Sequence, residues 1–560
     1  MFSGRTGKWS RGGAVRRFVV ASAIAVVVAA GFLPGSGLGS SAAAVRGAQK
    51  IPVGLAAAIH ARLGVGAIRS SSADSGLAGP YLGLAVSLSA DGTTALVGAP
   101  GVAGSRGAAY VFHASDAGSW SSSAIPPVTL TKKHGFAQGE FGRAVALSAD
   151  GTTAFVSAPF GPRLSSPGAV YVFHVSAEDA WSSSSTPTAT LTVSHSLFFG
   201  VVLALSADGT TLVVGDPIYK FPVGRAFVFH VSSEDAWAST STPAATLSPN
   251  DSDLDELGLR AAISADGTTV LLTDFGAGNA GATGGGAAVY HVSAANAWTS
   301  SSTPTAILSD ASGSPNDSRG NDLALSSDGT LALVSAPGAG SGAGGAVDVF
   351  HASGAAAWAS TSTPTAILTD NAVSLSAGGH WVVPVAVSSD GTTALVLAPG
   401  VNSRRGAAYI FRAASEGAWA SSATPSATLT NSGGHAKDFL GSVGVLSADG
   451  ATALVGADDV QSYTGAAYVF HAADQSSWTT SSTPNATLTN KALAACVVPK
   501  LKGLKLPAAR SALAVGRCKL GRVTKVHSNS RRQKGRVLSQ NRKPGSRLAI
   551  NAKVNVKIGK

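Results

Sequence analysis

Two short markers recur seven times along this 560-residue chain at a nearly constant spacing. The first is Ser-(Ala/Ser)-Asp-Gly, with its aspartates 58 to 62 residues apart at Asp91, Asp150, Asp208, Asp266, Asp328, Asp390 and Asp449. The second is a tryptophan before a Ser/Thr-rich stretch, at Trp120, Trp181, Trp237, Trp298, Trp358, Trp419 and Trp478. A fixed period of this kind indicates a solenoid, a propeller or an array of repeated units.

Each repeat contains four segments typical of strands. In the copy over residues 141–192 they are Arg143 to Leu147, Thr152 to Ala158, Ala169 to Val175 and Thr188 to Thr192, rich in Val, Ala, Thr and aromatic residues. The Asp-Gly pair between the first two predicts a type I′ hairpin turn. Four antiparallel strands repeated seven times predict a mainly β chain with a seven-bladed propeller of four-stranded blades. A β-solenoid is the alternative, but its coils are usually shorter.

The amino-acid sequence of the repeats over residues 81–490 resembles that of a known repeat family. Phe141-Gly142, Gly98-Ala99-Pro100 and the stretch Gly107 to Phe112 are similar to the FG-GAP repeat of integrin α-subunit propellers and of many exported bacterial proteins. The resemblance implies a propeller, and in metal-binding versions several Asp or Asn ligands in the first hairpin. Here each hairpin offers one carboxylate, whereas calcium takes six to eight oxygens, so we expect metal-free hairpins whose aspartates cap turns.

One acidic stretch outside the hairpins has the alternating spacing of a calcium loop. Asp251, Asp253 and Asp255 are followed by Glu256, at the position where the EF-hand pattern needs glycine. This departure favours a solvated acidic loop, and the three aspartates are kept only as a candidate metal site.

Repeated histidines and carboxylate pairs do not predict catalysis. Six repeats carry an aromatic-His pair, at His113, His174, His230, His291, His351 and His471, and the sixth repeat has Arg412 instead. A radial arrangement holds equivalent side chains apart, as it does the pairs Glu178-Asp179 and Glu234-Asp235. Because general acid-base catalysis needs groups that converge on one substrate, we assign no catalytic or cofactor-binding residue and expect no enzyme and no cofactor. The tryptophans are expected to pack between adjacent blades.

The beginning of the chain has the pattern of a secretory signal. Five basic residues precede the apolar run Phe18 to Leu33 and the small residues Ala42-Ala43-Ala44, which matches the three regions of a signal peptide. We therefore predict a signal peptide over residues 1–44, which is either cleaved or kept as an anchor, and a linker or leader over residues 45–80. The chain is expected to be secreted or associated with the cell wall.

Charge is segregated along the chain, and the last 70 residues carry 19 basic residues and no acidic one. Pro507 and Gly516 favour a short helix over Leu506 to Val515, with strands at Leu520 to Val526, Arg536 to Gln540 and Val554 to Ile558.

Residues 491–560 resemble a PASTA domain, the wall-associated module of penicillin-binding proteins and Ser/Thr kinases. The resemblance rests on Val498-Pro499, Gly503, Ala509, Leu513, Gly535 to Gln540, Pro544-Gly545 and Val554-Asn555-Val556. The two cysteines, Cys496 and Cys518, are either a disulfide, which export favours, or two buried thiols.

These features predict a non-catalytic exported bacterial protein. The resemblance implies that residues 491–560 bind peptidoglycan or another anionic wall polymer, while the propeller offers an interaction or adhesion surface to an unidentified protein or glycan. We expect no nucleic-acid partner and a monomer, and the sequence assigns no wall-binding residues. The alternative is a secreted polysaccharide- or wall-active hydrolase or lyase with its site in the propeller loops.

Overall fold

The computed structural model describes residues 79–560, apart from residues 136–137, 162–165, 197, 221–222, 250–255, 276–284, 315, 341–343, 373, 377–382, 494, 528–532 and 550–551. The predicted signal peptide and nearly all of the predicted linker, up to residue 78, lie outside the described residues. Among the helices within those described ranges, none has the length and apolar character needed to span a membrane.

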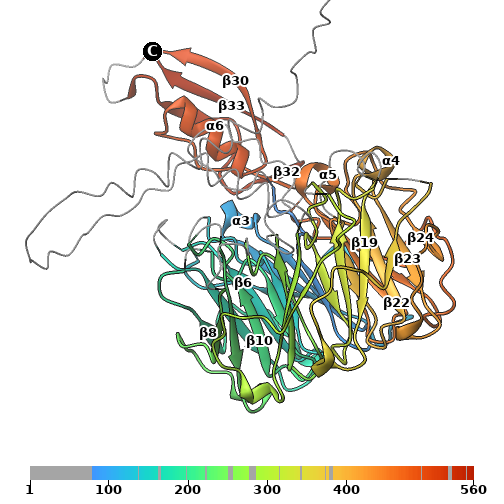
Figure 1. Cartoon of the computed structure of the whole chain (residues 1–560). Coiled ribbons are helices and arrows are strands. Elements are labelled where there is room, and N and C mark those ends of the chain that lie inside the picture. The colour runs from blue at the N-terminus through green and yellow to red at the C-terminus, as the bar shows by residue number, and fades with distance from the viewer. Residues whose placement is uncertain are drawn as a thin grey trace, which may run out of the picture. The chain divides into compact units, whose positions relative to one another are not determined.

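Seven four-stranded antiparallel sheets follow one another along the chain, and each is built from four consecutive strands (Figure 1). The first strands contact their counterparts in both neighbouring sheets, which places them around a common axis. They are β1 (Val86–Leu88), β5 (Val145–Leu147), β9 (Leu203–Leu205), β13 (Ala261–Ile263), β17 (Leu323–Leu325), β21 (Val385–Val387) and β25 (Val443–Leu446).

The middle two strands of each blade are the longest and are almost fully buried. The second strands are β2 (Thr94–Ala99), β6 (Thr153–Ala158), β10 (Thr211–Gly215), β14 (Thr269–Asp274), β18 (Leu331–Ala336), β22 (Thr393–Ala398) and β26 (Thr452–Ala457). The third strands are β3 (Ala108–His113), β7 (Ala169–His174), β11 (Ala226–His230), β15 (Gly286–His291), β19 (Ala346–His351), β23 (Ala407–Arg412) and β27 (Ala466–His471).

Short outer strands complete the blades. These are β4 (Val128–Leu130), β8 (Ala189–Leu191), β12 (Ala245–Leu247), β16 (Ala306–Leu308), β20 (Ala366–Leu368), β24 (Ala427–Leu429) and β28 (Ala486–Leu488). One-turn helices lie in the connections, namely α3 (Val102–Ser105), α4 (Val401–Arg404) and α5 (Val460–Tyr463) after second strands, and 3-10 turns over Glu178–Ala180, Glu234–Ala236, Ala295–Ala297, Ala355–Ala357 and Glu416–Ala418 after third strands. The prediction of a mainly β chain with seven four-stranded blades is confirmed.

The ring closes by direct contact between the last blade and the first. A circle of seven backbone hydrogen bonds, 2.8 to 3.2 Å long, links the turn of each blade to the turn of the next. Ala448 N donates to Ala90 O of the first blade and Ala90 N donates to Ala149 O of the second, so the circle has no gap. Leu82 and Gly465 form a further bridge across the closure. Among the described residues, the first and last sheets are each formed from four consecutive strands, without exchange of a strand between them.

The Asp-Gly turns differ from the predicted type I′. That type needs positive φ at both central residues, but only the glycine, such as Gly92 at +75°, has a positive φ. Gly92 N donates to Ser89 O, and the hairpin closes one step further out, where Ser89 N donates to Thr94 O. The loop is therefore longer than two residues, and the aspartate is free to accept a hydrogen bond from the backbone.

Apolar side chains fill the space between adjacent blades. Trp237 of the third blade packs edge to face against Phe155 of the second blade, with ring centroids 5.0 Å apart. Each of the seven tryptophans also donates from its indole nitrogen to the carbonyl of the turn glycine in its own blade, as Trp237 does to Gly209 O at 2.8 Å. The two repeated markers are thus joined by one hydrogen bond in every blade.

The C-terminal module contains a helix against a small sheet. Its elements are β29 (Ala495–Val497), α6 (Leu506–Val515), β30 (Lys519–Val526), β31 (Val537–Gln540), β32 (Arg547–Ala549) and β33 (Lys553–Gly559), close to the predicted helix and strands. The sheet has the order β30-β33-β31. Ala509 and Leu513 of α6 share a buried cluster with Val554 and Val556 of β33. Cys496 and Cys518 form a disulfide, as export favoured.

Candidate functional site

The C-terminal module has an exposed, cationic sheet face. Along β33, Val554, Val556 and Ile558 are buried beneath α6, whereas Lys553, Asn555 and Lys557 are exposed, as expected when side chains alternate across a strand. Lys519 of β30 lies directly opposite Lys553. Directly opposed like charges destabilise a sheet, so a bound anionic group would relieve this pair. We call Lys519, Lys553 and Lys557 the cationic sheet face.

The propeller has two ends of different character. The hairpin face is the end formed by the seven Asp-Gly turns and by the connections between third and fourth strands. The loop face is the opposite end, formed by the links between second and third strands and by the connections between blades. Antiparallel order places each kind of connection at one end only.

On the hairpin face every repeated aspartate caps its own turn, as predicted. Asp91 Oδ1 accepts from the backbone nitrogen of Thr93 at 3.0 Å and from the hydroxyl of Ser89 at 2.6 Å. The other six aspartates also accept from the backbone nitrogen two residues on. An aspartate that folds back on its own backbone in this way stabilises a turn.

Acidic side chains from the next blade crowd these turns. Glu178 Oε1 accepts from the hydroxyl of Thr93 at 2.9 Å, while the same hydroxyl lies 3.0 Å from Asp91 Oδ2. One hydroxyl hydrogen cannot serve both carboxylates, so Asp91 and Glu178 meet with a single donor between them. At the boundary of the sixth and seventh blades, an amide takes the place of the glutamate, and Gln475 Nε2 donates to Asp390 Oδ2 at 2.6 Å.

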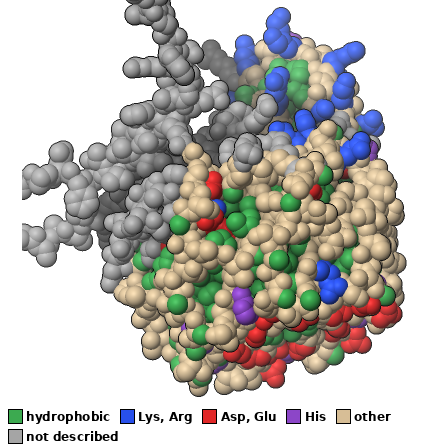
Figure 2. Space-filling model, turned by 45° about the vertical axis from the view of Figure 1, so that its right-hand side comes forward, with side chains coloured by type: hydrophobic (Ala, Val, Ile, Leu, Met, Phe, Trp, Pro, Cys, Tyr) green, Lys and Arg blue, Asp and Glu red, His purple; other side chains and the backbone are tan. Residues whose placement is uncertain are grey.

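The hairpin face is strongly acidic. It carries 14 carboxylates, and Arg412 is the one lysine or arginine in the segments that form it. All seven turn aspartates are exposed, and Figure 2 shows acidic side chains gathered along one end of the propeller. The carboxylates are Asp91, Asp116, Asp150, Glu178, Asp179, Asp208, Glu234, Asp235, Asp266, Asp328, Asp390, Glu416, Asp449 and Asp474.

The repeated histidines end the third strands on this face, and five of the six contact a threonine within their own blade. His113 Nδ1 lies 2.8 Å from the hydroxyl of Thr94, and four other histidines make the equivalent contact with a threonine of the second strand. His174 Nε2 also lies 3.0 Å from Asp235 Oδ1 of the next blade. The histidines therefore have a repeated structural role and do not assemble one centre.

At the loop face, by contrast, non-equivalent residues from separate blades come within electrostatic reach. Glu140 and Arg143 lead into the second blade, and Arg143 interacts with Arg260 of the fourth blade and Asp458 of the seventh. Blades so far apart in the ring meet only near its axis, so we call Glu140, Arg143, Arg260 and Asp458 the axial cluster. The ring thus separates equivalent side chains while bringing together these unique ones.

Burial controls the electrostatics of the axial cluster. It raises the pKa of Glu140 to about 7 and that of Asp458 above its ordinary value, although Arg143 opposes both shifts. Glu140 Oε2 and Arg143 Nη1 are 3.9 Å apart, and neither atom has a hydrogen-bond partner among the described residues. Arg260 Nε is paired with Asp322 Oδ1 at 3.2 Å. Glu140, Arg143 and Asp458 are buried, whereas Arg260 is partly exposed.

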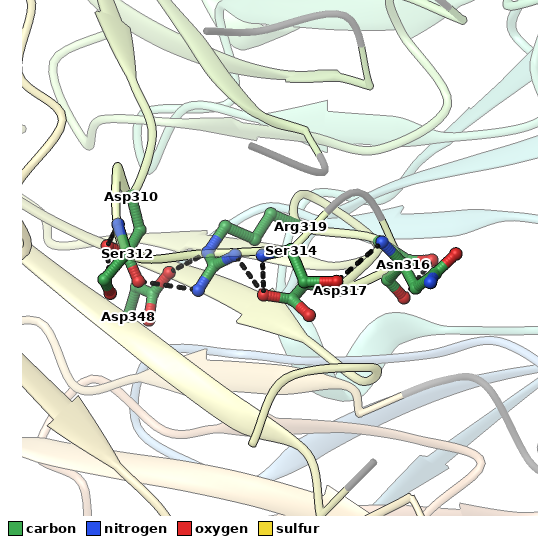
Figure 3. A network of polar contacts seen from close by, with 8 residues as sticks. Asp310, Ser312, Ser314, Asn316, Asp317, Arg319 and Asp348 are labelled. Carbon is green, nitrogen blue, oxygen red and sulfur yellow. Dashed lines mark hydrogen bonds and ion pairs between the residues drawn. The ribbon is translucent and has the colours of Figure 1, made fainter. Parts of the chain in front are cut away.

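A second unique cluster lies before and within the fifth blade (Figure 3). Arg319 donates from Nε to Asp348 Oδ2 at 2.7 Å, from Nη1 to Asp317 Oδ2 at 2.6 Å and from Nη2 to Asp310 Oδ2 at 2.7 Å. All four side chains are buried. One guanidinium faces three carboxylates, and burial raises the pKa of Asp348 to about 6 despite the opposing effect of Arg319.

The candidate metal residues Asp251, Asp253 and Asp255 lie outside the described residues. Within the described ranges, no three His, Cys, Asp or Glu side chains are arranged to hold a metal ion. Sequence reasoning missed both unique clusters. The signal that points to one of them is a departure from the repeat, because Asp348 stands where most other blades have tyrosine or phenylalanine.

Comparison with known proteins gives a match at the C-terminus. The family model of the PASTA domain matches residues 497–560. A solved structure described as "Structure of Dos1 propeller" is similar over 70% of this chain and 81% of that chain, with 10% sequence identity and a TM-score of 0.41. The search of curated proteins found no match. The chain therefore combines a seven-bladed propeller, seen in its own sheet topology, with a C-terminal PASTA domain. A PASTA domain and a disulfide are both typical of extracytoplasmic proteins.

Proposed function

We propose that this chain is an exported, non-catalytic protein of the bacterial cell wall. Its PASTA domain binds peptidoglycan, and its propeller, whose repeats we assign to the FG-GAP type, presents a surface to another protein or glycan. The observation that carries the proposal is a PASTA domain with an exposed cationic sheet face and no acidic residue from position 491 to the C-terminus.

The cationic sheet face suits a repeated anionic polymer. Lys519 and Lys553 lie side by side across two strands, and Lys557 follows on the same side of β33. Lysine ammonium groups attract carboxylates, which peptidoglycan carries on its stem peptides, without demanding one fixed geometry. The attraction between exposed charges is screened by salt, so wall binding should weaken as ionic strength rises.

Co-sedimentation of the purified full chain with insoluble peptidoglycan tests the proposal. At low salt the chain should appear in the pellet, and Lys553→Gln with Lys557→Gln should lower the bound fraction several-fold. The matched control is Lys500→Gln with Lys502→Gln, which removes the same charge from exposed positions outside the sheet and should have a smaller effect. A wild-type chain that stays in the supernatant at low salt would exclude the proposed wall binding.

A further inference from the structure

The chain exposes two surfaces of opposite charge. The hairpin face has 14 carboxylates against one arginine, and the C-terminal module has 19 basic residues and no acidic one. Figure 2 shows acidic side chains along one end of the propeller and Lys and Arg side chains over the module. Complementary potentials of this size guide two surfaces into contact and suppress contacts between like-charged ones.

Carboxylates crowd together on the hairpin face, although hydrogen bonds within the propeller outweigh burial and lower the pKa of Asp150, Asp266 and Asp390. Asp91 and Glu178 share the hydroxyl of Thr93, and burial together with Asp328 raises the pKa of Glu416 at an equivalent blade boundary. Arg412 is the one cationic side chain of Lys or Arg type on this face. Maintaining carboxylates at such short range is unfavourable in isolation, and a cationic partner would offset the repulsion.

The module of the same chain contacts the opposite face, because Arg517 Nη2 donates to the hydroxyl of Thr464 at 2.7 Å in a link of the loop face. Strand β28 runs from the hairpin face towards the loop face, and the chain leads from its end into the module. Three residues then separate Lys491 from β29, which starts at Ala495. They span at most about 14 Å, so this connection is short.

We propose that the hairpin face binds the cationic sheet face of the C-terminal module of a second copy of this chain. One copy then offers its hairpin face and the other its module, so the contact is heterologous and each complex keeps a free surface of both kinds. Contacts of that type extend into open chains unless the rotation closes a ring. The proposal replaces the expectation of a monomer with salt-dependent head-to-tail association, and it does not depend on wall binding.

Sedimentation velocity of the full chain at low and high salt tests this association. The wild type should sediment faster with rising concentration at low ionic strength and as a monomer at about 1 M salt, where the Debye length falls to about 3 Å. Asp116→Lys with Asp179→Lys changes exposed aspartates that cap no turn and should weaken the association at low salt. Lys553→Glu with Lys557→Glu should do the same.

Mixing the two charge-reversed variants gives the decisive measurement. Each variant alone has one altered surface. In the mixture the unaltered hairpin face of one variant can bind the unaltered cationic sheet face of the other, so the mixture should sediment faster than either variant alone. The control Lys133→Glu with Lys437→Glu changes the same charge at exposed sites outside both surfaces and should associate like the wild type. A wild type that is monomeric at low salt at every concentration, or a mixture that stays monomeric although both variants unfold cooperatively, would overturn the proposal.

Discussion

Arg319 and Asp348 form a buried ion pair where another blade packs two aromatic rings. Arg319 Nε lies 2.7 Å from Asp348 Oδ2. In the second blade the equivalent positions hold Phe141 and Tyr171, whose ring centroids are 5.6 Å apart. Both Arg319 and Phe141 bridge a glycine of the preceding blade, so the backbone geometry is the same. The fifth blade therefore has a charged contact where the second blade has an apolar one, at an equivalent place in the fold.

Replacing Arg319 alone should strongly destabilise the propeller. Arg319→Leu leaves the carboxylates of Asp310, Asp317 and Asp348 buried without their shared cation, and breaking a buried pair in this way costs about 3–5 kcal/mol. Arg319→Leu with Asp348→Tyr restores the apolar pair of the other blades and should recover part of that loss. Urea unfolding at neutral pH measures both. Additive effects of the two substitutions would contradict a direct coupling between Arg319 and Asp348.

The axial cluster should make stability depend on pH. The pKa of Glu140 rises from an ordinary 4.5 to about 7 in the folded protein, first because the carboxyl is buried. A raised pKa means that the folded state holds the proton more tightly, so this contribution is present below about pH 4.5 and is lost as pH rises through about 7. Glu140→Gln should remove about 1 kcal/mol per pH unit from the fall in unfolding free energy between pH 5 and 7.

Denaturant titrations at several pH values measure that slope. The slope is the useful readout because the substitution also changes the partner of Arg143 and so alters absolute stability. Asp348→Asn provides a comparison at a distant site, where the folded-state pKa is about 6, and should flatten the slope mainly between pH 4 and 6. A slope that Glu140→Gln leaves unchanged would contradict the raised pKa of this carboxyl.

The blades could be predicted from sequence because their determinants are local and repeated. Asp150 and Gly151 form the turn between adjacent strands, and Trp181 donates to the carbonyl of Gly151 within the same repeat. Each copy confirms the others, so strand order and blade number follow from the spacing. The turn type was predicted wrongly, because the loop length depends on where cross-strand hydrogen bonding stops.

The unique clusters could not be predicted in the same way. Arg143, Arg260 and Asp458 lie at different positions of different repeats and meet only because the ring closes. A repeat pattern describes the residues that the blades share. It therefore carries no information about which of the residues outside the pattern contact one another. The sequence gives a stronger signal for the pairing of Arg319 with Asp348, because each residue replaces an apolar residue of the repeat and both belong to the fifth blade.

Glycines at the blade boundaries should be intolerant of any side chain. A Cβ at Gly406 would lie 1.9 Å from the carbonyl oxygen of Leu440, and its φ of +86° is in the left-handed region. Gly406→Ala should therefore destabilise the propeller by about 2–4 kcal/mol. Gly354→Ala is the control, because no heavy atom lies within 4 Å of its Cβ position, and thermal unfolding should shift little. Equal shifts for the two variants would argue against close approach of the blades at Gly406.

The disulfide should stabilise the PASTA domain without affecting the propeller. Cys496 and Cys518 are 22 residues apart and tie β29 to the start of β30, and closing a loop of that length contributes about 3 kcal/mol in the chain-entropy estimate. Calorimetry of the full chain should show one transition that moves to lower temperature when a reductant is added and another that does not. Cys496→Ala with Cys518→Ala should show the lowered transition with or without reductant. If the reductant moved the propeller transition instead, the stabilising effect of the disulfide would not be confined to its own domain.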